Sequence, residues 1–274
     1  MSHADKYAVF GNPIKQSKSP VIHAAFATQC GQDIQYRAVR VELGQFAAAA
    51  RRFFDGGGRG LNVTVPFKQD AFEFADVLSR RAQRAGAVNT LSREDDGSIH
   101  GDNTDGVGLV RDLTANLAVE LSGKRLLLLG AGGAARGVLG PLLEQQPTHL
   151  VIANRTAERA EQLSDLFSDI GALTGCGFAA LGGEAFDVVI NATAAGLRGE
   201  VPDLPEGIIG PQTCCYDMMY GSAPTAFMRY AQQRGARRAF DGLGMLVEQA
   251  AESFRLWRGV KPATGPVIDF LRRH

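Results

Sequence analysis

Lys68 and Asp105 are the two residues of this chain whose surroundings best suit chemistry. Lys68 ends the segment Asn62-Val-Thr-Val-Pro-Phe-Lys68, in which two valines alternate with polar residues as in a half-buried strand. Pro66 has no amide hydrogen to give to a sheet, so the strand should end there. Thr64 and Lys68 then lie at the carboxyl end of a strand, where open α/β sheets bind ligands.

Asp105 follows in the polar segment Asn103-Thr-Asp-Gly106. An ammonium group can donate towards a carbonyl oxygen, and a nearby carboxylate keeps that group charged and oriented. A lysine, a carboxylate and the dinucleotide-binding segment described below together indicate carbonyl–alcohol redox chemistry. Taken alone, Lys68 could be a solvated surface lysine and Asp105 a turn or helix-cap residue.

Ser17 and Ser19 are candidates for binding an anion. They flank a lysine beside the turn Gly11-Asn-Pro13, and hydroxyl groups at the start of a helix suit a carboxylate ligand. Because Ser19 precedes Pro20, we expect Ser19 to be the N-cap of a helix with Pro20 in its first turn. Capping alone would explain Ser19 but not Ser17. His23, within the same helix, is expected to be structural.

A glycine-rich segment marks a nucleotide site in the second half of the chain. The apolar run from Lys124 to Leu129 predicts a buried strand, and Gly130-Ala-Gly-Gly-Ala-Ala135, a G-x-G-x-x-A variant, leads from it into a helix. The glycines permit a tight turn and a close backbone approach, and the helix offers amide donors to a pyrophosphate. The alternative is an ordinary glycine turn. The predicted cofactor contacts in this segment are Gly130, Ala131, Gly132, Gly133 and Ala134.

The end of the following strand indicates which dinucleotide binds. An NAD site usually places Asp or Glu about 20 residues after the glycines, to bind the ribose 2′-hydroxyl. This chain has Ala153-Asn-Arg-Thr156 instead, without an acid. Arg155 can pair with a 2′-phosphate, and Asn154 and Thr156, the latter also a predicted helix N-cap, add neutral hydrogen bonds. NADP is therefore favoured over NAD. Arg159, one turn further on, is either a second phosphate contact or an exposed helix arginine.

Strands and helices alternate along both halves of the chain, and in the second half this alternation predicts a parallel sheet covered by helices on both faces. In the first half, strands are expected at 7–10, 34–41 and 61–65, paired short strands within 87–103, and a helix from residue 45. In the second half, strands are expected at 125–129, 149–153, 186–191, 214–218 and near 237–240, and helices at 134–144, 157–167 and 223–233. The apolar stripe of a last helix, from Leu243, should pack back onto the first half. The expected domains are therefore 1–106 with 243–274, and 107–242.

Composition argues against several classes of protein. The chain has 274 residues, 45% of them hydrophobic, and its 29 basic and 29 acidic residues leave a formal net charge of zero. Without a basic excess, nucleic acid is not an expected partner. The most apolar window, residues 126–143, is too interrupted to span a bilayer, and the first residues have no apolar signal core, so we expect a cytoplasmic protein. The cysteines show no metal-ligand spacing, and Cys214 and Cys215 are expected to be buried thiols in one strand. No metal site is expected.

Eight segments match, in order and from end to end, the motifs of one known family. They are Gly11-Asn-Pro-Ile-Lys-Gln-Ser-Lys-Ser-Pro20, Asn62-Val-Thr-Val-Pro-Phe-Lys68, Gly86-Ala-Val-Asn-Thr90, Asn103-Thr-Asp-Gly106, Gly130 to Arg136, Asn154-Arg-Thr156, Tyr216-Asp-Met-Met-Tyr220 and Gly242-Leu-Gly-Met-Leu-Val-Glu-Gln-Ala250. On these segments the chain resembles the shikimate dehydrogenases. The resemblance implies an N-terminal α/β substrate domain, a Rossmann-type doubly wound NADP-binding domain, and an active site in the cleft between them. It also implies the NADPH-dependent, reversible reduction of 3-dehydroshikimate to shikimate in aromatic amino-acid biosynthesis.

The resemblance further implies roles for single residues. It assigns the substrate carboxylate to Ser17 and Ser19, and it places Met218 and Gly242 beside the nicotinamide. Gln249 lies off the apolar stripe of its predicted helix, so its amide would face the cleft. Whether Lys68 or Asp105 transfers the proton is left open. The residues expected around the substrate ring and the reacting carbonyl are Thr64, Lys68, Asn89, Asp105 and Gln249, with Tyr220 nearby.

Three alternatives remain. A quinate/shikimate dehydrogenase of broader substrate and cofactor range would share the scaffold, although Arg155 argues against strong use of NAD. Another two-domain NADP enzyme, such as a folate dehydrogenase, would lack the paired serines and the 103–106 segment. A non-catalytic NADPH-binding module would keep the cofactor site without turnover, and the intact Lys68 and Asp105 argue against it. The oligomeric state, monomer or homodimer, is left open.

Overall fold

The chain forms two α/β units, each built around its own six-stranded sheet. In the computed structural model, which describes residues 4–183 and 185–274, one unit comprises Met1–Gly108 with Val247–His274, and the other comprises Leu109–Leu246. The expectation about the N-terminal segment falls partly on residues 1–3, which lie outside the described residues.

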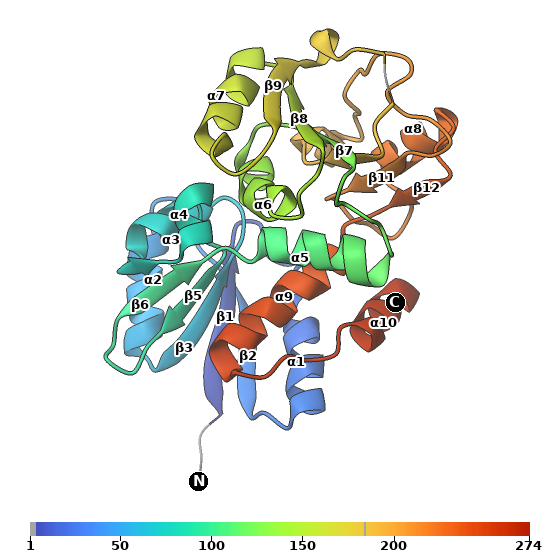
Figure 1. Cartoon of the computed structure of the whole chain (residues 1–274). Coiled ribbons are helices and arrows are strands. Elements are labelled where there is room, and N and C mark those ends of the chain that lie inside the picture. The colour runs from blue at the N-terminus through green and yellow to red at the C-terminus, as the bar shows by residue number, and fades with distance from the viewer. Residues whose placement is uncertain (1–3, 184) are drawn as a thin grey trace. The chain divides into compact units, whose positions relative to one another are not determined.

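The first unit is built on a mixed six-stranded sheet in the order β2-β1-β3-β5-β6-β4 (Figure 1). Its strands are β1 (Asp5–Gly11), β2 (Ile34–Arg40), β3 (Gly58–Val63), β4 (Val77–Leu78), β5 (Thr90–Arg93) and β6 (Ile99–Asp102). β1 is parallel to β2 and β3, whereas β5 is antiparallel to β3 and β6. Because Thr90 pairs with Asp102 in the β5–β6 hairpin, Asn89 and the segment that begins at Asn103 leave the sheet at the same edge.

Helices cover both faces of this sheet. Ala8 and Phe10 of β1 belong to a core with α2 (Phe46–Asp55), α3 (Lys68–Phe74) and α4 (Arg80–Ala85). Tyr7 alternates with Ala8 and so faces the other side. There its ring lies 4.8 Å, between centroids, from that of Trp257 in α9 (Leu243–Arg258). Nε1 of Trp257 also donates to the carbonyl oxygen of Leu91, so α9 packs on the first unit as predicted. The remaining helices here are α1 (Ser19–Cys30), α10 (Gly265–Arg273) and most of α5 (Asp105–Arg111).

The second unit contains an all-parallel six-stranded sheet in the order β12-β11-β10-β7-β8-β9. Its strands are β7 (Arg125–Leu129), β8 (His149–Asn154), β9 (Leu173–Gly177), β10 (Val188–Asn191), β11 (Cys214–Asp217) and β12 (Arg238–Phe240). This is the doubly wound Rossmann order, in which the direction of strand addition reverses between β7 and β10. Ligands of such sheets bind outside the carboxyl ends of the strands at that point. The predicted Rossmann-type domain is confirmed.

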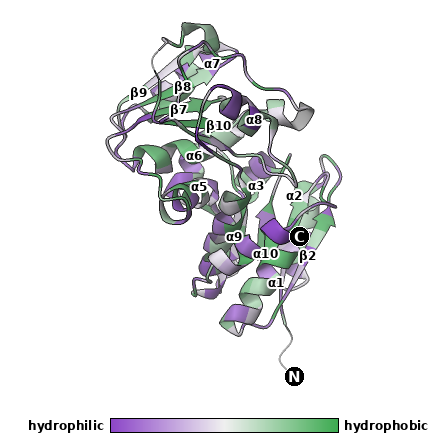
Figure 2. Ribbon diagram, turned by 90° about the vertical axis from the view of Figure 1, so that its right-hand side faces the viewer, coloured by the Kyte–Doolittle hydropathy of each residue, from purple (hydrophilic) through white to green (hydrophobic). Residues whose placement is uncertain are grey.

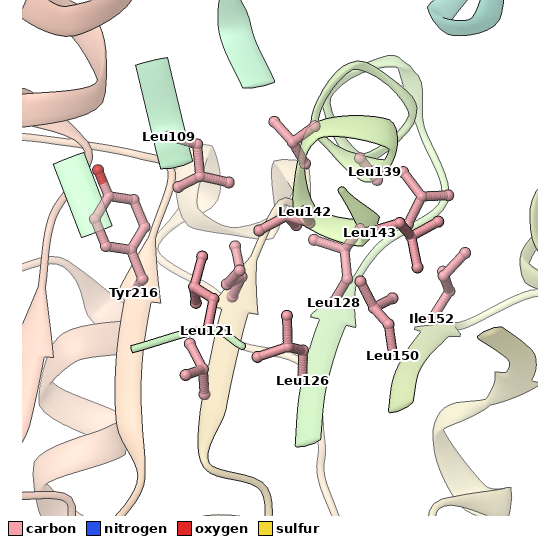
Figure 3. Close-up of a cluster of buried hydrophobic side chains, with 14 of the residues drawn as sticks. Leu109, Leu121, Leu126, Leu128, Leu139, Leu142, Leu143, Leu150, Ile152 and Tyr216 are labelled. Atoms are coloured by element: carbon pink, nitrogen blue, oxygen red, sulfur yellow. The ribbon is translucent and has the colours of Figure 1, made fainter. Parts of the chain in front are cut away.

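Consecutive leucines of β7 serve two cores on opposite faces of this sheet. Leu126 and Leu128 pack with residues of α6 (Gly133–Leu143) and α7 (Ala157–Phe167), as Figure 3 shows for the first of these helices. Leu127 and Leu129 pack with Phe227 of α8 (Ala226–Gln233). A strand buried on both faces needs no polar alternation, and Figure 2 shows β7 and β10 in the hydrophobic colour. Shorter turns are a π-helix at Asp112–Asn116 and 3-10 helices at Phe178–Ala180 and Ala194–Arg198.

Some local predictions are wrong. No strand was expected at the position of β9, which contains Gly175 and Gly177. A Cβ on Gly175 would lie 2.2 Å from the carbonyl oxygen of Ala160, so this glycine allows α7 to lie against the strand. Ser19 is not the N-cap of α1, because Lys18 occupies that position. Instead, Oγ of Ser17 accepts a hydrogen bond from the amide of Ser19 at 3.3 Å.

Cys214 and Cys215 are buried and belong to different cores on the two faces of β11. Burial raises the pKa of Cys214 to about 11 and that of Cys215 to about 12. Both thiols therefore stay protonated and unreactive at neutral pH. Across residues 4–183 and 185–274, none of the helices combines the length and the hydropathy that crossing a membrane requires.

Candidate active site

The ammonium group of Lys68 and the carboxylate of Asp105 are in direct contact, with Nζ 2.5 Å from Oδ2. Lys68 is the first residue of α3 and Asp105 the first residue of α5. The side chains are 29% and 12% exposed, respectively, so the lysine keeps more access to solvent. An ammonium group has three N–H donors, and contact with one carboxylate oxygen leaves other donors available. The pair can therefore hold its own geometry and still donate to a ligand oxygen.

Asn89 holds the other oxygen of the Asp105 carboxylate. Its Nδ2 donates to Oδ1 of Asp105 at 2.8 Å and to Oγ1 of Thr104 at 3.0 Å. Its Oδ1 accepts from the amide of Thr104 at 2.9 Å, while the amide of Asp105 donates to Oδ1 of Asn103 at 3.1 Å. Asn89, Asn103 and Thr104 are buried, where an unpaired polar group is costly. The network therefore fixes the orientation of the carboxylate.

Helix α9 brings Gln249 to this cluster from the far end of the chain. Its Oε1 accepts from Oγ1 of Thr104 at 3.3 Å and from Nδ2 of Asn89 at 3.5 Å. Gln249 is half-buried, but Glu248 and Glu252, which also lie off the apolar stripe, are only 3% and 2% exposed. The off-stripe position alone therefore does not mark a ligand-facing side chain. The contacts of Gln249 do place it in the same cluster as Asn89.

The Ser19 end of α1 is linked to the same cluster through Tyr36. The hydroxyl group of Tyr36 donates to Oδ1 of Asn62 at 2.7 Å, and Nδ2 of Asn62 donates to the carbonyl oxygen of Asn89 at 3.2 Å. Burial raises the pKa of Tyr36 well above its usual value, and a hydrogen bond with Ser19 opposes that shift. Hydrogen bonds therefore run from Tyr36 through Asn62 and Asn89 to the charged pair within the first unit. Ser17, half-buried, lies two residues before Ser19.

Thr64 lies just beyond β3, which ends at Val63, ahead of Pro66. The amide of Thr64 donates to the carbonyl oxygen of Phe10 at 2.9 Å. A Cβ on Gly11 would lie 2.5 Å from Cγ2 of Thr64, so the glycine makes room for this side chain. Thr64 is thus fixed against β1 in the same unit as Lys68.

His23 packs behind Tyr36, with the two rings stacked at 4.2 Å between centroids and 8° between planes. It is fully buried, and neither ring nitrogen makes a hydrogen bond of ordinary length and angle with the described residues. Burial lowers the pKa of His23 to about 3, with a smaller opposing effect of Asn62. His23 is therefore neutral at physiological pH, which suits the structural role expected of it.

A pocket of about 680 Å³ opens in the second unit, beyond the carboxyl ends of β7, β8 and β10. Gly130 has a φ of 105°, which residues with side chains rarely adopt. A Cβ on Gly132 or Gly133 would meet nothing within 4 Å, so the backbone at the start of α6 is open to a ligand. That is the space a pyrophosphate needs. All nine residues predicted from the two nucleotide motifs line this pocket: Gly130, Ala131, Gly132, Gly133, Ala134, Asn154, Arg155, Thr156 and Arg159.

The β8 end of the pocket carries its positive charge. Arg155 and Arg159 are both exposed side chains of the pocket wall. Nδ2 of Asn154 donates to the carbonyl oxygen of Thr156 at 2.9 Å, which stabilises the turn between them. Thr156 occupies the N-cap position of α7, but its side chain does not cap the helix. A phosphate placed here would meet two guanidinium groups and a helix start, as a 2′-phosphate requires.

Part of the pocket wall was not among the predicted cofactor contacts. Ala192, Thr193, Ala194 and Ala195 follow β10, in a segment that the resemblance places near the cofactor, and the neighbouring positions of β7 and β10 in the Rossmann order also indicate them. The other unpredicted wall residues belong to no motif, and only the fold reveals them. They are Phe178, Glu200, Val201, Pro202 and Asp203.

Met218, Tyr220 and Gly242 belong to the second unit but are not among the residues that line this pocket. The amide of Gly242 donates to the carbonyl oxygen of Met219 at 2.9 Å. A Cβ on Gly242 would lie 2.4 Å from the carbonyl oxygen of Met218, so only glycine fits there. Tyr220 is half-buried, and burial raises its pKa. The remaining residues predicted around the substrate, from Ser17 to Gln249, all belong to the first unit.

Three family models match successive parts of the chain. Residues 9–91 match the shikimate dehydrogenase substrate binding domain, residues 112–198 match shikimate / quinate 5-dehydrogenase, and residues 242–269 match the shikimate 5′-dehydrogenase C-terminal domain.

Individual relatives match almost the whole chain. The shikimate dehydrogenase (NADP(+)) of Methylococcus capsulatus is 57% identical over 271 residues, which cover 99% of this chain and 97% of that protein. An Ael1 enzyme from Pseudomonas putida has a crystal structure with a TM-score of 0.93 and 46% identity, covering 98% of both chains. Shikimate 5-dehydrogenase from Thermus thermophilus, in complex with NADP(H) and shikimate, has a TM-score of 0.85 and 32% identity, covering 98% of this chain and 99% of that one. The chain therefore belongs to the shikimate dehydrogenase family.

Proposed function

We propose that this protein catalyses the NADPH-dependent, reversible reduction of 3-dehydroshikimate to shikimate, in the pathway to the aromatic amino acids. The observation that carries the proposal is the contact of Lys68 with Asp105, supported by Asn89 and Gln249. An ammonium group held by a carboxylate is suited to polarise and protonate a carbonyl oxygen. Relatives that match nearly the whole chain are named as NADP(+)-dependent shikimate dehydrogenases.

The predicted site residues of the first unit have distinct roles in the reaction. Nζ of Lys68 donates to the carbonyl oxygen during reduction, and the charge that develops on that oxygen is stabilised by the ammonium group. Oδ2 of Asp105 holds the ammonium group and accepts from a neighbouring ring hydroxyl. Ser17 and Ser19 bind the substrate carboxylate. The other ring contacts are Thr64, Asn89 and Gln249, with Tyr220 nearby.

The pocket of the second unit fits NADP. Backbone amides at the start of α6, from Gly130 to Ala134, bind the pyrophosphate. The space beside Gly132 is open, which leaves room for the phosphate groups to approach the backbone. Arg155 binds the 2′-phosphate together with Asn154, Thr156 and Arg159. Met218 and Gly242 border the nicotinamide. The nicotinamide held there would supply the hydride chemistry at the carbonyl carbon of the substrate.

The proposal assigns substrate binding and catalysis to residues 1–106 with 243–274, and NADP binding to residues 107–242. All four cysteines are free thiols, as is usual in a reducing compartment, so the protein acts in the cytoplasm. With a formal net charge of zero it does not bind nucleic acid. It is a monomer or a homodimer.

A second candidate is a quinate/shikimate dehydrogenase, which is favoured by the match of residues 112–198 to a shikimate / quinate model. One experiment separates the two. The rise in NADPH absorbance is followed with shikimate and then quinate, each offered with NADP⁺ and with NAD⁺. Fast turnover only with shikimate and NADP⁺ is the expected result, and comparable turnover of quinate supports the second candidate. Binding of NADPH without turnover of either acid would contradict both and indicate a non-catalytic module.

A further inference from the structure

Asp217, the last residue of β11, is a fully buried carboxylate that neither the charged pair nor the nucleotide pocket explains. Its Oδ1 accepts from Nδ2 of Asn191 at 3.1 Å and from the amide of Met219 at 3.1 Å. Its Oδ2 is buried and makes no hydrogen bond of ordinary length and angle with the described residues, although Thr225 lies near enough to favour the charged form. Burial raises the pKa of Asp217. Burying a carboxylate costs free energy of folding, so a carboxylate at this position is expected to have a specific role.

Asn191 connects Asp217 to the wall of the nucleotide pocket. It ends β10, the neighbour of β11, and is 1% exposed. Its Oδ1 accepts from the hydroxyl group of Thr193 at 2.8 Å and from the amide of Thr193 at 3.2 Å. Thr193 lines the pocket. The Asn191–Asp217 contact therefore joins the loop after β10 to the turn after β11.

The turn after β11 is held from three sides. The amide of Met218 donates to the carbonyl oxygen of Asn191 at 3.0 Å, and the amide of Met219 donates to Asp217. The carbonyl oxygen of Met219 accepts from the amide of Gly242 at 2.9 Å, and a Cβ on Gly242 would collide with Met218. The backbone that carries Met218 cannot shift without breaking one of these contacts. The other contacts join backbone groups, and only the contact with Asp217 depends on a side chain of β11.

We propose that Asp217 is a positioning residue for the nicotinamide half of the dinucleotide. It does not touch the cofactor. It fixes the turn that contains Met218 relative to the loop that contains Thr193. The backbone beside the nicotinamide therefore keeps one position. The inference rests on the proposed function, because it takes the pocket as the NADP site and Met218 as a neighbour of the nicotinamide.

The test compares Asp217→Leu with Asp217→Asn. Leucine has nearly the shape of aspartate without an acceptor, whereas asparagine keeps the Oδ1 that accepts both hydrogen bonds. Two ligands are titrated: NADPH, and 2′,5′-ADP, which has the adenosine and the 2′-phosphate but no nicotinamide.

In Asp217→Leu we expect kcat for shikimate oxidation with NADP⁺ to fall about 100-fold, which is the effect of a displacement of about 1 Å at a reacting group. NADPH should bind about tenfold more weakly while the affinity for 2′,5′-ADP changes less than about twofold, because only the nicotinamide end has lost its support. Asp217→Asn should behave like the wild type in all three measurements.

Equal loss of affinity for both ligands in Asp217→Leu would mean that Asp217 merely stabilises the second unit, and would overturn the proposal. Wild-type kcat in Asp217→Leu, or an Asp217→Asn variant as impaired as Asp217→Leu, would overturn it as well. Should Asp217→Leu fail to fold, Asn191→Ala replaces it, because this variant removes the side-chain donor to Asp217. Asn191→Ala must then lose more affinity for NADPH than for 2′,5′-ADP. Binding of both ligands by a wild type that does not oxidise shikimate would refute the proposed function, while the comparison of the two ligands still tests Asp217.

Discussion

Oδ2 of Asp105 lies 2.5 Å from Nζ of Lys68, while Oδ1 of the same carboxylate accepts a hydrogen bond from the buried amide of Asn89. One oxygen is thus anchored in the protein interior and the other holds the ammonium group. Rotation of the carboxylate would break the contact with Asn89 or with Lys68. The position of the ammonium group is therefore set by α3, α5 and the residue that precedes β5 together, rather than by the flexible lysine stem.

Replacing Asp105 with asparagine keeps the shape of the side chain and removes its charge. We expect kcat for shikimate oxidation to fall by roughly 100- to 1,000-fold, because the ammonium group loses its orientation and the neighbouring ring hydroxyl loses its charged acceptor. The affinity for NADPH, measured by fluorescence titration, should not change. Asp70→Asn, an exposed acid in the first turn of α3, is the matched control and should retain full activity. Similar kcat values for Asp105→Asn and this control would remove the carboxylate from the mechanism.

Gly132→Ala should separate ligand binding from folding. Gly132 has a φ of −91°, which alanine adopts readily, and the added Cβ meets nothing within 4 Å. The thermal midpoint of the free protein should therefore stay the same, whereas NADPH affinity should fall roughly 10- to 100-fold as a phosphate–amide contact is lost. Gly182→Ala, equally open but outside the pocket, should change neither quantity. Unchanged NADPH affinity in Gly132→Ala would place the pyrophosphate elsewhere.

Arg155→Met should lower the affinity for NADPH far more than that for NADH. A charged hydrogen bond to the 2′-phosphate is worth about 1.5–3 kcal/mol, so the preference for NADPH should shrink roughly 10- to 100-fold. Arg159→Met, an exposed arginine one turn further along the same pocket wall, should have the smaller effect. Parallel losses for the two nucleotides in Arg155→Met would refute the assigned contact with the 2′-phosphate.

His23 makes the stability of the protein depend on pH. Burial lowers its folded-state pKa to about 3, whereas an unfolded histidine has a pKa of about 6.5. The unfolded chain therefore binds the extra proton first, and stability that is present above pH 6.5 is lost as the pH falls towards 3. Between pH 7.5 and 5 this group should cost about 2 kcal/mol of the free energy of unfolding.

The variant His23→Phe isolates that contribution. Urea unfolding of both proteins at pH 7.5 and pH 5 should show the difference in unfolding free energy moving by about 2 kcal/mol in favour of the variant at the lower pH. Other titrating groups cancel in this comparison. An identical pH dependence of the two proteins would mean that His23 is not held neutral in the fold.

The second sheet could be predicted almost strand by strand because its signals are local. The helix expected at 157–167 coincides with α7, and the glycines after β7 mark the nucleotide pocket. β9 was missed because Gly175, one of its two glycines, makes room for Ala160, a contact that no pattern within the strand reveals. The cap of α1 was misassigned because the pattern favoured the hydroxyl of Ser19, whereas the N-cap is Lys18, whose side chain makes no capping hydrogen bond.

The cluster around Asp105 could be predicted only through family resemblance. Asn89 and Gln249 are 160 residues apart, so no spacing rule joins them. The layer behind them, in which Asn62 bonds to Thr90 and Ser253, was not predicted at all. Such polar groups are recognisable only when the fold shows that they are buried and paired.

The central claim is that the ammonium group of Lys68 acts on the oxygen of the reacting carbonyl, and one comparison of kcat tests it directly. Shikimate oxidation with NADP⁺ is measured in the wild type and in Lys68→Met, whose unbranched side chain is one atom shorter and carries no charge. We expect a fall in kcat of about 1,000-fold, because general acid–base catalysis and charge stabilisation are lost together, with unchanged NADPH affinity. Turnover in Lys68→Met within about threefold of the wild type would contradict the claim.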